Sequence, residues 1–81
     1  MIAESSENHP LRFEIHSDLT IHVQIEDRFL EFNSWSEFKR RVRNKREEDY
    51  SEISEEGQAV FDFLEKCIEK YNERMEIIES I

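Results

Sequence analysis

Apolar and polar residues alternate strictly over two runs, 11–16 and 19–26, and this pattern constrains the fold more than any other feature. The apolar positions are Leu11, Phe13, Ile15, Leu19, Ile21, Val23 and Ile25. A period of two places one set of side chains on one face, so the sequence predicts two β-strands with a single buried face. A shorter run at 28–32 places Leu30 and Phe32 on one side and predicts a third strand.

The parity of the alternation predicts the loop between the first two strands. Because both apolar faces must coincide, Ile15 has to lie opposite Ile21 or Leu19. Either pairing needs a loop with an odd number of residues, such as 17–19, whereas a two-residue turn would break the buried face.

The second loop has the opposite parity. If Ile25 lies opposite Leu30 and Val23 opposite Phe32, the loop must have an even number of residues, such as 27–28. Neither loop contains the Gly that tight hairpin turns prefer, so the turn types stay open.

The period changes after residue 33 to that of a helix. The segment 34–37 reads Ser-Trp-Ser-Glu, a capping box in which the Ser34 hydroxyl accepts from the Glu37 amide and the Glu37 carboxylate returns to the Ser34 amide. Trp35, Phe38 and Val42 then share one helical face. We expect this helix to end near Arg46, with basic residues in its last turn.

A second, long helix is predicted to begin between Ser51 and Ser54, both suitable N-caps, and to run to about Ser80. Its apolar stripe comprises Ile53, Val60, Phe61, Leu64, Cys67, Ile68, Tyr71, Met75 and Ile78. A stripe of this width suits a helix that packs on one face.

The predicted fold is therefore α+β, a three-stranded antiparallel β-meander followed by two helices (β-β-β-α-α), of which the second is long and amphipathic. The apolar face of such a sheet needs a cover, and two helices can supply it. Residues 1–10 show no pattern and are predicted to be a flexible tail. Residues 11–81 are predicted to form one domain.

The composition narrows the possible partners. Twenty acidic and eleven basic residues give a net charge of −9, which disfavours nucleic acid and anionic membranes as partners. We find neither an apolar run long enough to span a membrane nor the pattern of a signal peptide, and we expect a cytoplasmic protein. The single cysteine, Cys67, excludes an internal disulfide and suits a reducing compartment.

No set of residues at a recognisable spacing predicts catalysis, a cofactor or a metal site, so we expect a protein that is not an enzyme. His16 and His22 fall on the polar face of the predicted hairpin, with His22 opposite Glu14, but no third ligand is evident from spacing. Cys67 lies within the apolar stripe and is predicted to be a small core residue.

The main functional hypothesis is a small acidic protein-interaction module, an inhibitor or regulator that occupies a basic surface of a partner protein. The residues predicted to bind the partner are Asp62, Glu65, Glu69, Glu73, Glu76, Glu47, Glu48 and Asp49. Electrostatic steering would speed association and make it sensitive to salt. In size and acidity the chain resembles phage-encoded inhibitors of host enzymes, which implies a basic, nucleic-acid-binding target surface.

Two alternatives remain open. A nucleic-acid-binding protein would use the basic cluster, defined as Lys39, Arg40, Arg41, Arg43, Lys45 and Arg46. This cluster could instead be neutralised within the fold by the acidic residues 47–56 or by the second helix. A structural or adaptor subunit would dock through helix 53–81. The apolar end of that helix, with Met75, Ile77, Ile78 and Ile81, is predicted to extend beyond the sheet and to favour a homodimer or a dedicated protein partner.

Overall fold

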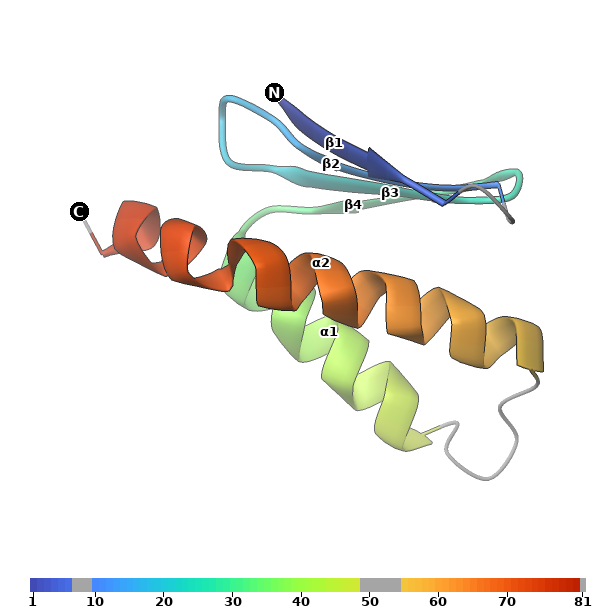
Figure 1. Ribbon diagram of the computed structural model, residues 1–81. Helices are drawn as coiled ribbons and strands as arrows, with labels where there is room; N and C mark the ends of the chain where they lie inside the picture. The colour runs from blue at the N-terminus through green and yellow to red at the C-terminus, as the bar shows by residue number, and fades with distance from the viewer. Residues whose placement is uncertain (7–9, 49–54, 81) are drawn as a thin grey trace.

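The computed structural model describes residues 1–6, 10–48 and 55–80, and it shows a four-stranded antiparallel sheet followed by two helices. The strands are β1 (Ile2–Ser5), β2 (Leu11–Ile15), β3 (Ile21–Ile25) and β4 (Arg28–Phe32). The helices are α1 (Trp35–Glu48) and α2 (Glu55–Glu79). The strands lie side by side in chain order, and both helices cover the same face of the sheet (Figure 1).

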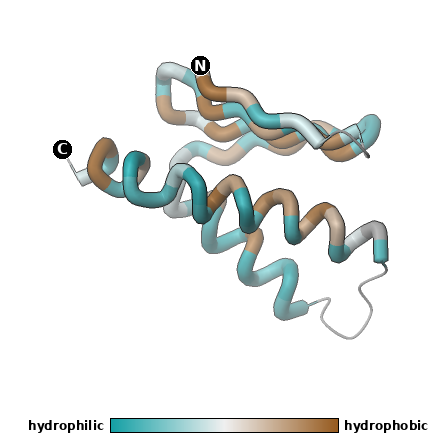
Figure 2. Tube along the Cα trace, in the orientation of Figure 1, coloured by the Kyte–Doolittle hydropathy of each residue, from teal (hydrophilic) through white to brown (hydrophobic). Residues whose placement is uncertain are grey.

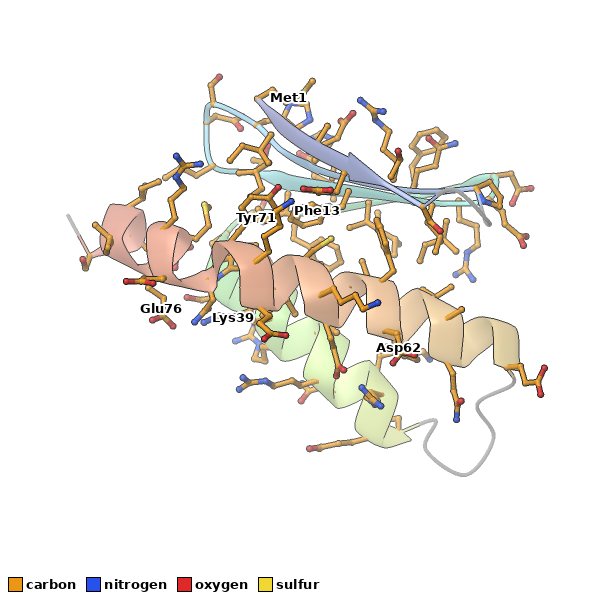
Figure 3. All side chains as sticks on the ribbon, in the orientation of Figure 1. Met1, Phe13, Lys39, Asp62, Tyr71 and Glu76 are labelled. Atoms are coloured by element: carbon orange, nitrogen blue, oxygen red, sulfur yellow. The ribbon has the colours of Figure 1, made fainter. Side chains whose placement is uncertain are left out.

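The core forms where the predicted apolar face of the sheet meets the helices. Its buried members are Phe13, Ile15, Ile21, Val23, Phe32, Trp35, Phe38, Val42, Leu64, Cys67 and Met75. Phe13, at the centre, stacks on Tyr71 of α2 with ring centroids 6.1 Å apart, and Figure 3 shows the two side chains between sheet and helix. It also contacts Phe38 at 5.5 Å and the edge of Trp35 at 6.3 Å. Aromatic contacts from one strand therefore join both helices to the sheet.

The expected number of strands was wrong by one, because residues 2–5 add a strand that we expected to be part of a tail. β1 pairs with β2 so that Ile2 lies opposite Ile15 and Glu4 opposite Phe13. Ile2 and Glu4 are half-buried, while Ala3 and Ser5 are exposed. Only one apolar residue therefore faces the helices, which is too little alternation for a sequence pattern to reveal.

The β2–β3 hairpin follows the parity prediction. Ile15 pairs with Ile21, and residues 17–19 form a three-residue loop in which the His16 amide donates to the Thr20 carbonyl at 2.9 Å. Leu19 has a φ of 69°, in the left-handed region that the last residue of such loops adopts. The Asp18 carboxylate accepts from the Thr20 amide and hydroxyl, at 3.1 and 2.6 Å.

The β3–β4 hairpin has an even loop, as predicted, but the predicted register was wrong by two residues. Val23 pairs with Leu30 rather than with Phe32, and the turn consists of Glu26 and Asp27. Glu26 has a φ of 56°, at the first turn position, where hairpins of this length usually carry Gly. Parity fixes which side chains share a face, but it does not fix the loop length. A shift of the register by two residues keeps the same side chains on the buried face.

Helix α1 begins as its capping residues predict, with one difference. The Glu37 amide donates to the Ser34 hydroxyl at 3.1 Å. The Glu37 carboxylate accepts from the amide of Asn33 at 2.9 Å, one residue before the partner we expected. The helix continues to Glu48, two residues beyond its predicted end at Arg46. The start of α2 at Glu55 leaves its predicted N-caps, Ser51 and Ser54, outside the described residues.

Helix α2 runs along the whole molecule and is longer than the strands of the sheet, as expected. Twenty-five residues span about 38 Å at 1.5 Å per residue, against about 17 Å for a five-residue strand. The start of α1 covers part of the overhang, so Met75 is only 1% exposed. Ile77 and Ile78 stay 58% and 38% exposed, and Ile53 and Ile81 lie outside the described residues.

A carboxylate near the end of α2 holds the start of α1. Glu79 accepts from the Trp35 amide at 2.7 Å, and its second oxygen accepts from the Ser36 hydroxyl at 2.9 Å. The Ser36 amide points to the same carboxylate at 3.4 Å. The first turn of a helix has unpaired amides and a positive dipole end, and an anion there satisfies both. Within the described parts of the chain, neither helix has the length and apolar character that crossing a bilayer requires.

We predict that Glu26→Gly stabilises the protein by about 1 kcal/mol, because Gly adopts a positive φ without the steric penalty of a Cβ. Urea unfolding followed by circular dichroism measures the change. The matched control is Asp27→Gly, at a position whose φ is not positive, where added freedom of the unfolded chain lowers stability. Equal effects of the two changes would contradict the turn geometry.

We predict that Glu79→Ala destabilises the protein by about 1–2 kcal/mol, because the first turn of α1 loses its acceptor. Glu73→Ala is the control, since Glu73 is an exposed residue of the same helix, and its loss should change stability by less than about 0.5 kcal/mol. Thermal unfolding compares the two variants. If Glu79→Ala lowered stability as little as Glu73→Ala does, the contact of Glu79 with the first turn of α1 would contribute nothing to stability.

Candidate functional site

Five of the acidic residues predicted to bind a partner lie on α2, and they divide into two groups. Glu76 pairs with Lys39 of α1 at 2.9 Å, as Figure 3 shows, and Glu65 pairs with Arg46. The other three, Asp62, Glu69 and Glu73, are exposed and form no hydrogen bond or ion pair within residues 1–6, 10–48 and 55–80. We call these three residues the acidic column. Two of these five carboxylates therefore form ion pairs with α1, and the other three are exposed to solvent.

The basic cluster of α1 is divided in the same way. Lys39 donates to Glu76 and, at 3.0 Å, to the side chain of Asn72, which also accepts from the Trp35 indole at 3.1 Å. The contact with Lys39 holds the pKa of Glu76 below its ordinary value. The idea that α2 neutralises part of the cluster is therefore confirmed for Lys39 and Arg46.

The side chains of Arg40, Arg41, Arg43 and Lys45 are exposed. Figure 2 shows the C-terminal end of α1 as hydrophilic. Glu47 and Glu48 are exposed at its end, while Asp49 lies outside the described residues.

The opposite edge of α2 has its own electrostatic contact, with β1. Glu4 accepts from Lys70 at 2.5 Å and from the Tyr71 hydroxyl. Lys70 first, and then Tyr71, hold the pKa of Glu4 below its ordinary value, and Glu4 in turn raises the pKa of both partners. Helix α2 thus forms an ion pair with β1 on this edge, in addition to the pairs of Glu65 and Glu76 with α1.

Cys67 is a core residue, as predicted. Its side chain is 4% exposed, and burial raises the pKa of the thiol to about 12. A thiol of this kind stays protonated near neutral pH and is a poor nucleophile or metal ligand.

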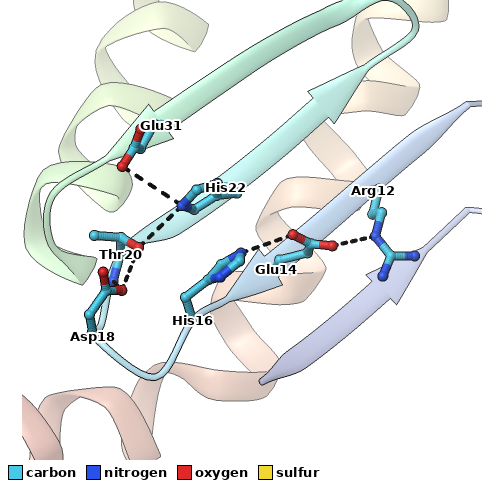
Figure 4. Close-up of polar contacts among 7 residues, drawn as sticks. All are labelled: Arg12, Glu14, His16, Asp18, Thr20, His22 and Glu31. Atoms are coloured by element: carbon cyan, nitrogen blue, oxygen red, sulfur yellow. Dashed lines mark hydrogen bonds and ion pairs between the residues drawn. The ribbon is translucent and has the colours of Figure 1, made fainter.

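The outer face of the sheet, which the described helices leave uncovered, gathers two histidines and a carboxylate (Figure 4). His16 Nε2 lies 2.9 Å from Glu14 Oε1, and the rings of His16 and His22 have centroids 4.0 Å apart. One ligand atom from each of Glu14, His16 and His22 lies within 4.8 Å of the other two. We call these three residues the histidine cluster.

Neighbouring polar groups orient the histidine cluster. Arg12 Nε donates to the second oxygen of Glu14 at 2.5 Å, and Arg12 first, with His16, holds the pKa of Glu14 below its ordinary value. His22 Nε2 lies 3.2 Å from the Thr20 hydroxyl and 3.8 Å from Glu31. Glu14 is therefore ionised near neutral pH, and both imidazoles have fixed neighbours.

No third ligand beside the two histidines was evident from spacing, and the structure places Glu14 next to both of them. Glu14 and His16 are two residues apart and share a face, and the register places Glu14 opposite His22, as expected. The alternation and parity of the hairpin contained the information needed to bring the three together. Spacing along the chain relates only Glu14 and His16, and His22 joins them through the pairing between the strands.

The pKa of Glu4 predicts a pH dependence. Because the folded pKa is depressed, its contribution is present above the unfolded pKa of about 4.3 and is lost as pH falls through the folded value. Glu4→Gln should lower the free energy of unfolding near neutral pH by up to about 1 kcal/mol. In this variant the free energy of unfolding should also decrease less steeply as pH falls below about 4. Urea unfolding at several pH values measures both effects. Glu69→Gln, which removes an exposed carboxylate, is the control and should leave the acid slope unchanged.

Comparison of the chain with known protein families, curated proteins and solved structures finds no significant match. Function therefore has to be inferred from the chemistry of the described surfaces.

Proposed function

We propose that this chain is a small acidic protein-interaction module that inhibits or regulates a partner protein by covering a basic surface on it. The observation that supports this proposal is the acidic column. Its three carboxylates lie on one face of α2 and have no ionic partner within the described residues.

The acidic column is held rigidly. Asp62 and Glu73 are eleven residues apart, which corresponds to about 16 Å along the helix axis. Figure 3 shows Asp62 on the side of α2 away from the sheet. The same helix is fixed on one side to α1 and on the other to Glu4, so binding would order little of the backbone.

Electrostatics supplies the mechanism. A net charge of −9 attracts a basic partner from a distance, and rows of Lys or Arg on the partner would pair with the column on contact. Steering of this kind raises the association rate and weakens as salt rises. Occlusion of a basic, nucleic-acid-binding surface is the form of inhibition that this chemistry favours.

The exposed residues Arg40, Arg41 and Arg43 support the alternative, a nucleic-acid-binding protein. Their side chains are exposed on α1. The net charge opposes this alternative, and two bases of the same cluster, Lys39 and Arg46, already pair with α2. The adaptor alternative is also weaker, because α2 buries Leu64, Cys67 and Met75 of its apolar stripe within the protein itself.

We predict that the triple variant Asp62→Lys, Glu69→Lys and Glu73→Lys loses at least tenfold in affinity for any basic protein that the native chain captures from its host. The matched control changes the same net charge on the β3–β4 hairpin, through Glu26→Lys, Asp27→Lys and Glu31→Lys, and should keep most of the affinity. Surface plasmon resonance at rising salt should show a falling association rate for the native chain.

Equal loss in both triple variants would mean that only net charge matters, and no loss in either would exclude the acidic column. Labelled DNA and RNA test the alternative at low salt. Tight binding that disappears in Arg40→Ala, Arg41→Ala, Arg43→Ala would favour nucleic acid over a protein partner.

A further inference from the structure

We infer that the histidine cluster is a binding site for a divalent transition-metal cation, with Zn²⁺ as the ion that its ligands suit best. The site lies on the outer face of the sheet, away from the acidic column of α2, and does not depend on the proposed function.

The donor set matches the chemistry of such ions. Two imidazoles and one carboxylate form a common set for zinc and for non-haem iron, with further positions left for water. All three residues come from one antiparallel hairpin, Glu14 in β2, His16 directly after it and His22 in β3. Regular strand pairing therefore holds the ligands in place, and the sheet twist does not separate them.

The distances require little movement. The three ligand atoms lie within 4.8 Å of one another. Ligand atoms around a tetrahedral Zn²⁺, each 2.0–2.1 Å from the metal, are about 3.3 Å apart. Small rotations about the side-chain bonds close this difference. The side chains of His16, His22 and Glu14 are 33%, 39% and 20% exposed, so an ion can reach them while the strands restrict their motion.

The surroundings favour a cation. Glu14 is ionised, and its second oxygen accepts from Arg12, which orients the carboxylate as outer-shell partners of metal ligands do. Glu31 lies 3.8 Å from His22, and Asp18 accepts from Thr20 beside it. The carboxylates of Glu31 and Asp18 therefore add to the negative charge beside the histidines, as Figure 4 shows.

The ion would replace the present contact between His16 Nε2 and Glu14 Oε1, which are 2.9 Å apart. A metal between these atoms keeps the two side chains together and adds His22 from the next strand. Binding therefore links β2 to β3 through side chains as well as through the backbone. An ion that binds only the folded hairpin must raise the unfolding temperature.

Titration of the chelator-treated full chain with ZnCl₂ near neutral pH tests the inference by calorimetry. We expect one ion per chain with a micromolar dissociation constant. His16→Gln and His22→Gln should each weaken binding at least tenfold, and Glu14→Gln should weaken it less. His9→Gln, which removes a histidine elsewhere in the sequence, and Glu69→Gln are the matched controls and should bind as the native chain does.

Two further measurements separate the site from general attraction to an acidic protein. Excess Ca²⁺, which prefers oxygen ligands, should not compete with Zn²⁺. In histidine side-chain NMR of the native chain, the resonances of His16 and His22 should move on zinc addition while those of His9 stay. Zinc at a hundredfold excess over its dissociation constant should raise the unfolding temperature by about 10 °C.

Three outcomes would overturn the inference. The first is an absence of zinc binding at micromolar concentration. The second is binding that persists when both His16 and His22 are replaced, or that Ca²⁺ displaces. The third is a stoichiometry of one ion per two chains, which would place the ion between molecules rather than within one hairpin.

Discussion

The fold depends on the contact of one apolar sheet face with two helices through a cluster of aromatic rings. Phe13 sits at its centre and touches Trp35, Phe38 and Tyr71. Each of these rings comes from a helix, so burying one strand residue fixes both helices against the sheet. In a chain this small, a few large side chains supply much of the apolar area that folding removes from water. The polar contacts around these aromatic rings add to the packing of the helices on the sheet but could not hold them there alone.

Ion pairs then join the two edges of α2 to α1 and to the sheet. One edge of α2 pairs with α1 through Glu65 and Glu76, and the other edge pairs with β1 through Lys70. Like charges four residues apart slightly destabilise an isolated helix. In this protein Glu65, Glu76 and Lys70 each meet an opposite charge, whereas the acidic column has no ionic partner within the described residues. What faces solvent is the part of the charge that these contacts leave over, and this remainder is the basis for the proposed function.

Periodicity and parity predicted much of this fold. The period of two identified β2 and β3 and their buried face, and Ser34 identified the start of α1. β1 was missed because its one helix-facing apolar residue, Ile2, makes no pattern. The β4 register was missed because parity cannot distinguish loops that differ by two residues. The contacts that depend on tertiary distance, such as Glu79 with Trp35, have no local pattern at all. At the histidine cluster, the hairpin register predicted that Glu14 lies opposite His22, whereas the distances among the three side chains depend on their rotamers, which the alternation does not give.

The order of the strands has a consequence for how the chain folds. Every strand pairs with its neighbour in the sequence, so the sheet can grow from one hairpin to the next with short loops and little entropy lost in closing them. Chains dominated by such local contacts fold quickly. The links between distant residues, Trp35 with Glu79 and Glu4 with Lys70, are separated by 44 and 66 positions. We therefore expect a sheet that assembles early and a long helix that docks last, with its contacts to Trp35 and Glu4 formed only when the rest of the molecule is in place.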